Sequence, residues 1–331
     1  MFEVKILRIK DIRPIPDADK ICTYIIGNDW PVVDQVNKYQ IGSLVAYLPI
    51  DSLIPDNLLE QLELTGKLSG ARKNKVKAIR LRKQLSLGII CPAPEGFTEG
   101  DDVQSYYGIE RFEEVIPEQF RGIIRPKPPG YIKFDVDNIR NESWFEANEE
   151  VVCTEKIHGT SSSYVLIEDR FYVCSRNICL EQDDNNLYWK ITKKYNIEEK
   201  LRSLGMDNVW IHGEIFGKGV QDLIYNCNEP EFRIFDARLH NNYYNYDHFL
   251  KLMCQLELPT VPELYRGPFS QEIVDQYTSG MEQVSGTECH IREGIVIRPV
   301  TERIAGKNTV RVISKSVSEA YLLRKNGTEF H

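Results

Sequence analysis

A lysine inside a short polar segment is the residue with the clearest chemical potential. Lys156 leaves an apolar, β-type run and enters the polar turn of the segment TEKIHGTS, residues 154–161. A lysine amine becomes a nucleophile once it loses its proton, and because its unperturbed pKa is about 10.4 this requires nearby cations or desolvation. A lysine at a strand end is also a common solvent-exposed side chain. The spacing of the other charged motifs must decide between the two interpretations.

Three other charged residues interrupt or begin apolar runs further along the chain. They are Arg176 in VCSRN (173–177), Glu214 in IHGEIFG (211–217) and Glu293 in EGIVIR (293–298). A guanidinium offers a rigid fork of donors to a phosphate or a ribose, and a carboxylate at a strand start can hold a divalent cation beside phosphates. A surface arginine and outward-facing glutamates on aliphatic strands would explain the same residues.

The segment EKIHGT, residues 155–160, resembles motif I of the covalent nucleotidyltransferases, the superfamily of ATP-dependent ligases and capping enzymes. Residues 173–177, 211–217, 232–236 and 293–298 are similar to its motifs Ia, III, IIIa and IV, in the same order. His158 is typical of the RNA ligases, since many related DNA ligases and capping enzymes carry aspartate there. Residues 12–20, 42–47 and 50–52 resemble the OB module that some RNA ligases carry ahead of the transferase domain. The chain is therefore similar to ATP-dependent RNA ligases of the nick-sealing family.

This resemblance implies a role for each motif residue. Lys156 would attack the α-phosphorus of ATP and become a lysyl-AMP phosphoramide while pyrophosphate leaves. His158 would act after lysine adenylylation, during strand joining. The other residues that the resemblance assigns to ATP binding are Glu155 and Glu214 at the adenosine, Phe235 stacked on adenine, Arg176 and Asn177 at a phosphate or the ribose, and Glu293. Glu293 and Glu214 are the expected carboxylate contacts of a Mg2+ or Mn2+ ion.

The last family motif is where the chain departs from the pattern. The family usually places two basic residues, commonly lysines, on one face of the last strand to neutralise the α-phosphate. Here residues 310–315 read VRVISK. Strand alternation predicts Arg311, Ile313 and Lys315 on one face. We therefore expect Arg311 and Lys315 to be the catalytic cations, with Arg311 also contacting ATP.

Residues 1–115 are expected to form an OB-fold barrel that binds nucleic acid. Five β-type runs cover residues 4–9, 21–26, 44–48, 76–81 and 87–91, and turn-forming Pro, Gly, Asn and Asp separate them. No acidic residue lies between Glu63 and Glu95, and seven cations accumulate within residues 72–83: Arg72, Lys73, Lys75, Lys77, Arg80, Arg82 and Lys83. We expect this cluster to follow an RNA backbone. A solvated loop beside a polar strand edge is the alternative.

Residues 116–148 are expected to be a linker, because the sequence RPKPPG at 125–130 favours an extended connector over a packed element. Residues 149–331 are expected to form the adenylyltransferase domain. Its predicted elements are a hairpin over 163–167 and 171–175, β-type runs at 209–216, 232–235, 294–297 and 310–313, and helices over 187–204, 246–256 and 319–325. The predicted fold class is α+β, an OB-fold β-barrel followed by an ATP-grasp-like covalent nucleotidyltransferase domain built on antiparallel sheets.

Composition excludes several classes of protein. The 331 residues include 42% hydrophobic and 27% charged residues, an ordinary mixture for a soluble globular protein. No apolar run reaches the roughly 18 residues that a membrane helix needs, and the charged start argues against a signal peptide, so we expect a cytoplasmic protein, with the nucleus as the alternative location. We also expect a monomer. The eight cysteines form no CxxC pair and are expected to be reduced thiols. The net charge of -8 argues against indiscriminate polyanion binding, so RNA binding is assigned to the local basic cluster.

Three other functions share part of this pattern. An mRNA guanylyltransferase would use the same motifs but usually carries its OB domain after the transferase domain. An ATP-dependent DNA ligase is less favoured because of His158. A catalytically inactive RNA-binding relative would be expected to have lost Lys156, Glu214 or Glu293, and all three are present. The sequence therefore favours an enzyme that uses ATP and a divalent cation to join 3'-hydroxyl and 5'-phosphate RNA ends or nicks.

Overall fold

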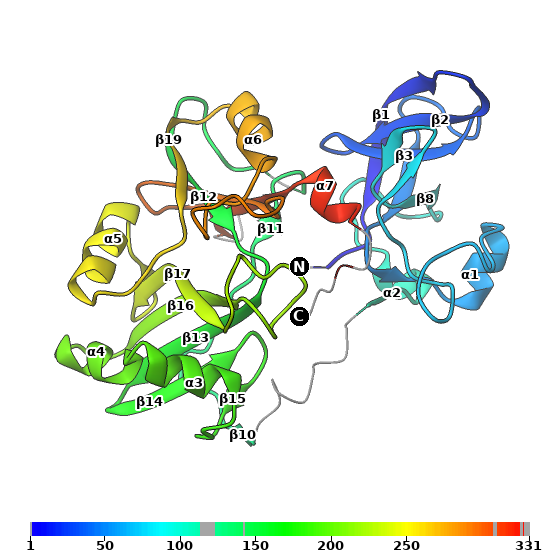
Figure 1. The fold of residues 1–331 in the computed structure, drawn as a ribbon. Helices are drawn as coiled ribbons and strands as arrows, with labels where there is room; N and C mark the ends of the chain where they lie inside the picture. Colours follow the sequence, from blue (N-terminus) through cyan, green and yellow to red (C-terminus); the bar gives the residue numbers. More distant parts are fainter. Residues whose placement is uncertain (1, 113–122, 142, 307–309, 325–326, 328–331) are drawn as a thin grey trace. The chain divides into compact units, whose positions relative to one another are not determined.

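The chain forms two compact units, whose elements are labelled in Figure 1. The computed structural model describes residues 2–112, 123–141, 143–306, 310–324 and 327. Residues 1–113 with 140–142 make up the N-terminal unit, and residues 114–139 with 143–331 make up the C-terminal unit. The predicted linker, 116–148, therefore groups mostly with the C-terminal unit, although its residues 116–122 and 142 lie outside the described residues.

The N-terminal unit is built on a five-stranded antiparallel sheet in the order β3-β2-β1-β4-β8. Its strands are β1 (Ile6–Ile15), β2 (Ala18–Ile26), β3 (Trp30–Gln35), β4 (Leu44–Leu48) and β8 (Ile89–Pro92). The long β1 pairs with β4 through its first residues and with β2 through the rest, as a strand that bends around a small barrel does. Val4, Ile6 and Leu48 are fully buried in a core that includes residues of helix α1 (Asp56–Gln61).

Shorter elements complete this unit. They are β5 (Ser52–Leu53) paired with β9 (Glu110–Arg111), the hairpin of β6 (Ile79–Leu81) and β7 (Gln84–Ser86), and helix α2 (Gln104–Tyr107). The run predicted at 76–81 becomes a strand only from Ile79, because Val76 belongs to the buried core instead.

Two sheets form the C-terminal unit. The seven-stranded sheet has the order β10-β15-β14-β13-β16-β17-β18. Its strands are β10 (Ile124–Arg125), β13 (Thr160–Ile167), β14 (Arg170–Ser175), β15 (Cys179–Leu180), β16 (Val209–Phe216), β17 (Glu231–Leu239) and β18 (Asn242–Tyr243). The five-stranded sheet has the order β11-β23-β20-β12-β19. Its strands are β11 (Asp137–Asn138), β12 (Glu150–Lys156), β19 (Glu263–Pro268), β20 (Gly294–Pro299) and β23 (Ser314–Val317). The strands β21 (Ile304–Ala305) and β22 (Val310–Arg311) form a separate ribbon.

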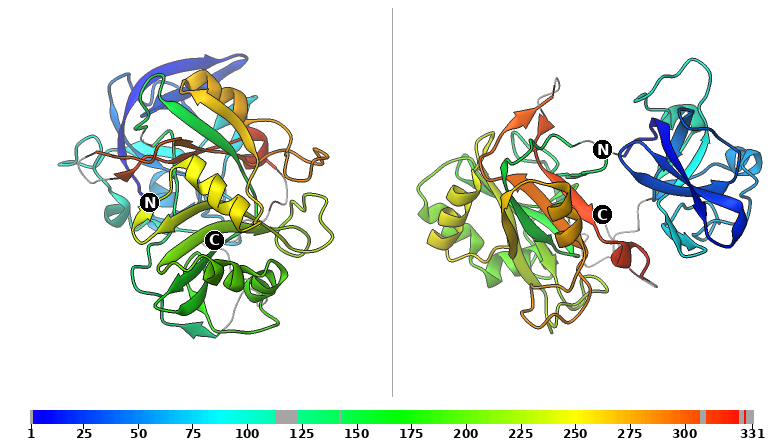
Figure 2. Two further views of the ribbon diagram at one scale, coloured as in Figure 1. Left: turned by 90° about the vertical axis from the view of Figure 1, so that its left-hand side faces the viewer. Right: turned by 90° about the horizontal axis from the view of Figure 1, so that it is seen from above.

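Helices cover these sheets, as the two views of Figure 2 show. The seven-stranded sheet shares its main apolar core with α3 (Leu187–Lys194), α4 (Ile197–Ser203) and α5 (Tyr246–Gln255). The five-stranded sheet packs on α6 (Gln271–Thr278), and α7 (Glu319–Leu322) follows β23. The helix predicted over 187–204 is in fact two helices, because Asn196 between them adopts a left-handed backbone with φ 52°. The predicted α+β class is confirmed, and the pairs within the two sheets are antiparallel except for the parallel pair of β11 and β23. Within the part of the chain that is described, no helix is long and apolar enough to span a membrane.

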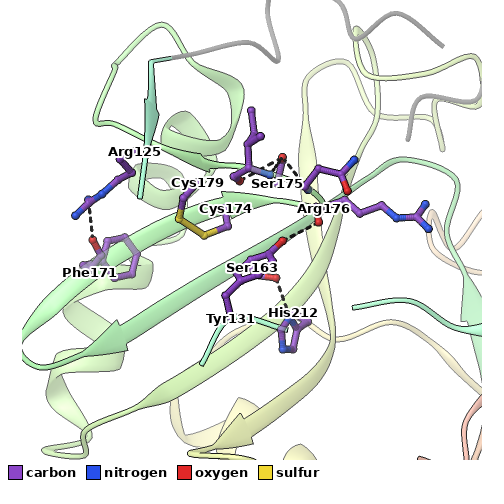
Figure 3. The surroundings of a disulfide bond; sticks show 11 residues. Arg125, Tyr131, Ser163, Phe171, Cys174, Ser175, Arg176, Cys179 and His212 are labelled. Atoms are coloured by element: carbon purple, nitrogen blue, oxygen red, sulfur yellow. Dashed lines mark hydrogen bonds between the residues drawn. A yellow bond between two sulfur atoms is a disulfide. The ribbon is translucent and has the colours of Figure 1, made fainter. Parts of the chain in front are cut away.

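Cys174 and Cys179 form a disulfide between β14 and β15, shown in Figure 3. The expectation of reduced thiols is wrong for this pair, because the hairpin register sets the two residues directly opposite each other with Cα atoms 4.0 Å apart. Cys22, Cys91, Cys153, Cys227, Cys254 and Cys289 are free.

Candidate active site

Lys156 is the last residue of β12 and projects toward the seven-stranded sheet. Alternate residues of a strand share a face, and Val152, four residues earlier on β12, lies in the core of that sheet. The Nζ atom of Lys156 lies 2.7 Å from Oε1 of Glu293, and the exposed fractions of the two side chains are 27% and 4%. The amine is therefore the accessible member of the pair, and the buried carboxylate holds it in place.

Glu293 has a second carboxylate oxygen with no partner of its own. Its Oε2 is buried and accepts no hydrogen bond from any described residue. A buried acceptor of this kind normally has a partner, and a divalent cation is a suitable one. No group of three or more His, Cys, Asp or Glu side chains capable of holding a metal occurs among the described residues. A cation at Glu293 would therefore take most of its ligands from phosphate oxygens and water, as Mg2+ commonly does.

Glu214, on β16, lies close enough to Lys156 and Glu293 to interact with both electrostatically. Its pKa is raised to about 8, chiefly because desolvation outweighs the nearby Lys156 and Arg176, and Glu293 acts in the same direction as desolvation. Gly159 makes the approach of motif I to this strand possible, since a Cβ atom there would lie 2.1 Å from the Ile215 carbonyl oxygen. Two sequence motifs separated by more than fifty residues thus meet at one place.

Arg176 and Lys315 bring two more cations to this place. The pKa of Lys315 is lowered by desolvation and by the nearby Lys156 and Arg176, while Asp135 and Glu293 oppose the shift. Gly294 allows β23, the strand of Lys315, to come this close, since its Cβ atom would lie 2.0 Å from the Ser316 carbonyl oxygen. The result is a concentration of positive charge suited to binding a polyphosphate.

Arg176 is paired with an acid that sequence reasoning missed. Its NH2 atom lies 2.9 Å from Oδ2 of Asp135, whose pKa stays below its ordinary value because Arg176 and Lys315 outweigh desolvation. Asp135 belongs to the predicted linker. The one available signal was the alternation of charged and apolar residues in KFDVD, residues 133–137.

A disulfide and hydrogen bonds constrain the hairpin turn that carries Arg176 and Asn177 (Figure 3). The disulfide closes its base, and the hydroxyl of Tyr131 donates to the Arg176 carbonyl oxygen at 2.7 Å. The backbone N–H of Asn177 donates to Ser175 Oγ at 3.4 Å. The turn therefore presents Arg176 from a constrained backbone, and the predicted contact of Asn177 with the nucleotide stays a prediction.

Arg311 and Lys315 do not lie on the same face of one strand. The prediction that they share one strand face is wrong, because the chain turns between β22 and β23, where the N–H of Ile313 donates to the carbonyl oxygen of Arg311 itself. The Arg311 guanidinium instead binds Glu302 at 2.6 Å and Asp236 at 2.5 Å. Asp236 is completely buried, so Arg311 neutralises a core carboxylate and Lys315 is the only one of the two predicted cations that joins Lys156.

The two residues predicted at the adenosine base occupy different surroundings. Glu155 alternates with Lys156 and faces the other side of β12, where its Oε2 accepts from the N–H of Gln283 at 2.7 Å and lies 4.0 Å from Nε of Arg292. Burial raises the pKa of Glu155 to about 7. Phe235 is half-buried, and its ring centroid lies 5.0 Å from that of Phe134. Stacking of Phe235 on adenine stays a prediction, whereas a direct contact by the Glu155 carboxylate would require entry from the opposite side of the strand.

His158 lies in the turn after Lys156 and is 3% exposed. Its Nε2 is 2.8 Å from Asp222 and its Nδ1 is 2.8 Å from the hydroxyl of Tyr321. The loop after β16 also holds the backbone of this turn, because the His158 N–H donates to the hydroxyl of Tyr225 at 2.6 Å. The sequence contained no signal for these partners, since none lies in a recognised motif.

Six of the seven cations in the basic cluster of the N-terminal unit are exposed, and one is buried. Lys75 is 9% exposed, binds Asp51 at 2.9 Å and sits 3.5 Å from the ring centroid of Phe112, so it is a core residue and its predicted RNA contact is wrong. The other members are exposed: Arg72, Lys73, Lys77, Arg80, Arg82 and Lys83. Arg82 and Lys83 form the tip of the β6–β7 hairpin, both with positive φ.

A family model described as RNA ligase matches residues 149–317, just over half of the chain, and spans Lys156, Arg176, Glu214, Glu293 and Lys315. The chain belongs to the RNA ligase family. A second model, described as an OB-fold domain, matches residues 3–93 and confirms the predicted N-terminal fold. No curated protein sequence matches the chain.

Solved structures of Naegleria gruberi RNA ligase have the same fold over almost the entire chain. A mutant solved with ATP and Mn shares 24% identity at a TM-score of 0.86, covering 97% of this chain and 98% of that one. A second mutant, with AMP and Mn, has 24% identity and a TM-score of 0.85, covering 96% and 97%. The structure with PPi has the same identity, TM-score and coverage as the second. This RNA ligase family member thus has the two-unit fold of those proteins.

Proposed function

We propose that this protein is an ATP-dependent RNA ligase that seals 3'-hydroxyl and 5'-phosphate ends at nicks through lysyl-AMP and RNA-adenylate intermediates. The observation that carries the proposal is the Lys156 amine, accessible at the end of β12 and 2.7 Å from the buried Glu293. Arg176 and Lys315 lie near enough to interact electrostatically with this pair. Membership of the RNA ligase family supports the same conclusion.

In the first step the Nζ atom of Lys156 attacks the α-phosphorus of ATP. A nitrogen–phosphorus bond forms, the bond to the pyrophosphate oxygen breaks, and the nitrogen gives up a proton. Arg176 and Lys315 would neutralise charge that builds on the phosphate oxygens. The buried Glu293 keeps Lys156 oriented before the nucleotide binds.

A divalent cation supplies charge neutralisation and Lewis acidity at the phosphates when it is bound. Glu293 fits this role because its buried Oε2 is without a partner among the described residues. Glu214 is the second carboxylate in the same field. Its raised pKa means that it also suits hydrogen bonding to a ribose hydroxyl in its protonated form.

Two transfers complete the proposed reaction. The 5'-phosphate of the RNA attacks the phosphorus of lysyl-AMP and releases Lys156, which leaves AMP on the RNA end. The 3'-hydroxyl then attacks the 5'-phosphorus of this RNA-adenylate, and AMP leaves as the phosphodiester forms. The exposed cations of the N-terminal unit, from Arg72 to Lys83, would hold the RNA backbone by displacing its counterions.

The test is covalent labelling of the full chain with α-labelled ATP and Mg2+ or Mn2+. Label should attach to the wild type and be absent from Lys156→Ala and Lys156→Arg, because neither offers a neutral amine in the same position. Glu293→Gln, which keeps the side-chain shape, should lower the labelling rate about 100-fold or more. No label on the wild type would indicate an inactive relative, and stronger labelling from GTP would indicate a capping enzyme.

Labelled enzyme should then be given an RNA nick, an RNA with free single-stranded ends and a DNA nick in parallel. Faster sealing of the RNA nick supports the nick-sealing assignment. Faster joining of free ends would contradict it while leaving the RNA ligase activity in place.

A further inference from the structure

The imidazole of His158 is held by partners from two distant parts of the C-terminal unit. Asp222 comes from the loop after β16 and lies 2.8 Å from Nε2. Tyr321 comes from α7 and lies 2.8 Å from Nδ1. The shorter contact at Nε2 is with the Asp222 carboxylate, which only accepts, while the Arg324 NH2 group lies farther from the same atom, at 3.4 Å. With the ring proton on Nε2, Nδ1 of the neutral ring accepts the proton of the tyrosine hydroxyl. One rotamer and one tautomer satisfy both contacts.

The same two partners are themselves fixed. Tyr321 is 1% exposed, and the guanidinium of Arg324 lies 3.6 Å from its ring centroid while its Nε lies 3.1 Å from Oδ2 of Asp222. Ser318 caps the N-terminus of helix α7, and its Oγ accepts from the N–H of Tyr321 at 3.3 Å. The His158 ring is therefore the meeting point of a packed cluster, which we name the imidazole clamp: His158, Asp222, Tyr321 and Arg324.

The imidazole clamp is also linked to the carboxylate of the candidate active site. The N–H of Ser318 donates to the carbonyl oxygen of Glu293 at 2.8 Å, and its Oγ donates to that of Arg292 at 2.8 Å. The start of α7 thus lies against the residue that binds Lys156. Helix α7 is placed by the strand of Glu293 and in turn places the ring of His158.

Lys156 and the imidazole depend on different supports. Lys156 ends β12 and is held through strand pairing and Glu293. The backbone of His158 is held by the hydroxyl of Tyr225. Loss of the Tyr321 hydroxyl would therefore remove one of the two contacts that orient the imidazole, at Nδ1, without displacing the lysine or the backbone of the turn.

We infer that Tyr321 and Asp222 are positioning residues for the strand-joining step, acting by fixing the orientation and tautomer of His158. This inference rests on the proposed ligase function and on the predicted role of His158 in joining. The geometry divides the reaction: lysine adenylylation uses Lys156 and its own supports, and joining uses the imidazole and the clamp.

The experiment compares two reactions of one variant, Tyr321→Phe, which removes a hydroxyl and keeps the buried ring. The first is lysine labelling by ATP. The second is joining of chemically pre-adenylylated RNA to a 3'-hydroxyl strand across a nick, which bypasses the first. We expect kcat for joining to fall about tenfold, as for the loss of one hydrogen bond, with KM for the RNA unchanged and labelling reduced less than twofold. Tyr265→Phe is the matched control, because its hydroxyl donates to Pro268 at an exposed site.

A second pair of variants tests the other side of the ring. Asp222→Asn keeps an oxygen that accepts from Nε2, whereas Asp222→Ala removes it. Joining should therefore fall more in the alanine variant than in the asparagine variant, with the KM for RNA again unchanged. This pair also tests the inference independently if Tyr321→Phe does not fold.

Three results would overturn the inference. Equal losses in labelling and joining would show that the clamp only stabilises the fold, and unchanged joining would show that the ring needs no such support. A rise in KM alone would assign the clamp to RNA binding. If the wild type neither labels nor joins pre-adenylylated RNA, the proposed function fails and the inference fails with it. The wild type alone shows this result, so it is distinguishable from a failure of the inference, which only the variants show.

Discussion

The cations of the C-terminal unit and those of the N-terminal unit are deployed in opposite ways. In the candidate active site, Lys156 and Arg176 each contact a carboxylate within 3 Å, at 2.7 Å and 2.9 Å. In the N-terminal unit, Arg72, Lys77 and Arg82 are exposed side chains on loops and a hairpin tip. Partly buried, paired charges act through position and are less screened, whereas exposed ones act through their number and lose effect as salt rises. One cluster is therefore suited to chemistry and the other to retention of a long polyanion.

Two cations that the sequence assigns to these groups serve neither purpose. Lys75 and Arg311 belong by sequence to a binding surface and to the active site, and both are instead committed to buried or partly buried carboxylates. Removal of such a residue takes a partner from a buried or partly buried carboxylate, which costs more than the loss of a surface charge. Their variants should therefore affect stability before activity.

The largest effects are expected when Lys315 and Arg311 are replaced one at a time and the two variants are compared. Lys315→Ala should lower the rate of lysine labelling about 100-fold, because a cation near the phosphates is lost, with little change in the free energy of unfolding. Arg311→Ala should lower that free energy by about 1.5–3 kcal/mol, because the buried Asp236 would lose one of its two arginine partners and keep Arg298 at 2.8 Å. Labelling kinetics and urea unfolding of both variants measure the two quantities. An Arg311→Ala protein that keeps its stability but no longer labels would contradict this prediction and would support a catalytic role for Arg311.

The next effect concerns the exposed cluster. Replacing Arg72, Lys73, Lys77 and Arg82 with serine should weaken binding of an RNA nick about tenfold or more and flatten its salt dependence by about 3 to 4 units of slope, while lysine labelling is retained. Lys75 is left intact because it is a core residue.

A matched control removes four exposed cations from the C-terminal unit. The control residues are Arg170, Lys190, Lys193 and Lys251. If both variants change the salt slope equally, the N-terminal cluster is only part of a diffuse charge distribution.

A smaller effect is expected at Asp135. Asp135→Asn removes the anion that occupies Arg176 and lies near Lys315, so ATP no longer has to displace it. Because the pair is partly exposed, we expect the apparent Kd for ATP to fall about threefold. Asp169→Asn is the control, since it breaks an exposed pair with Arg202 at 2.6 Å. Weaker ATP binding in Asp135→Asn would mean that Asp135 holds Arg176 in its productive position.

A further prediction concerns the pH dependence of stability. The pKa of Glu214 rises from 4.5 to about 8 in the fold. The folded chain therefore keeps a proton that the unfolded chain loses above pH 4.5, and the associated stability is lost as the pH rises through 8. Relative to Glu214→Gln, the wild type should lose free energy of unfolding between these values. A constant difference between the two proteins would show that Glu214 is already ionised at neutral pH.

Much of the site could be predicted because its motifs are local. Lys156, Glu214 and Glu293 each lie within or beside a strand whose apolar residues are recognisable in the sequence, and their order along the chain matches the family. The assignment of the OB-fold domain to the first part of the chain was likewise predictable, since its turns are punctuated by Pro, Gly, Asn and Asp.

Other features were not predictable because they depend on contacts between distant residues. Asp135 pairs with Arg176 and Tyr321 with His158, partners 41 and 163 positions apart in the printed sequence, and neither contact leaves a local pattern. The break at Asn196 and the turn at Ile313 interrupt elements that periodicity alone would continue.

The sequence determined the chemical groups, their order and the strands that carry them, because residue type and local spacing set secondary structure and family membership. The tertiary structure alone decided which charges act. Lys75 and Arg311 are as basic in the sequence as Arg72 and Lys315, and burial beside Asp51 and Asp236 turned them into structural residues. The physical reason is that the effect of a charge depends on the dielectric and the partners around it, and these are set by chain segments far away in sequence.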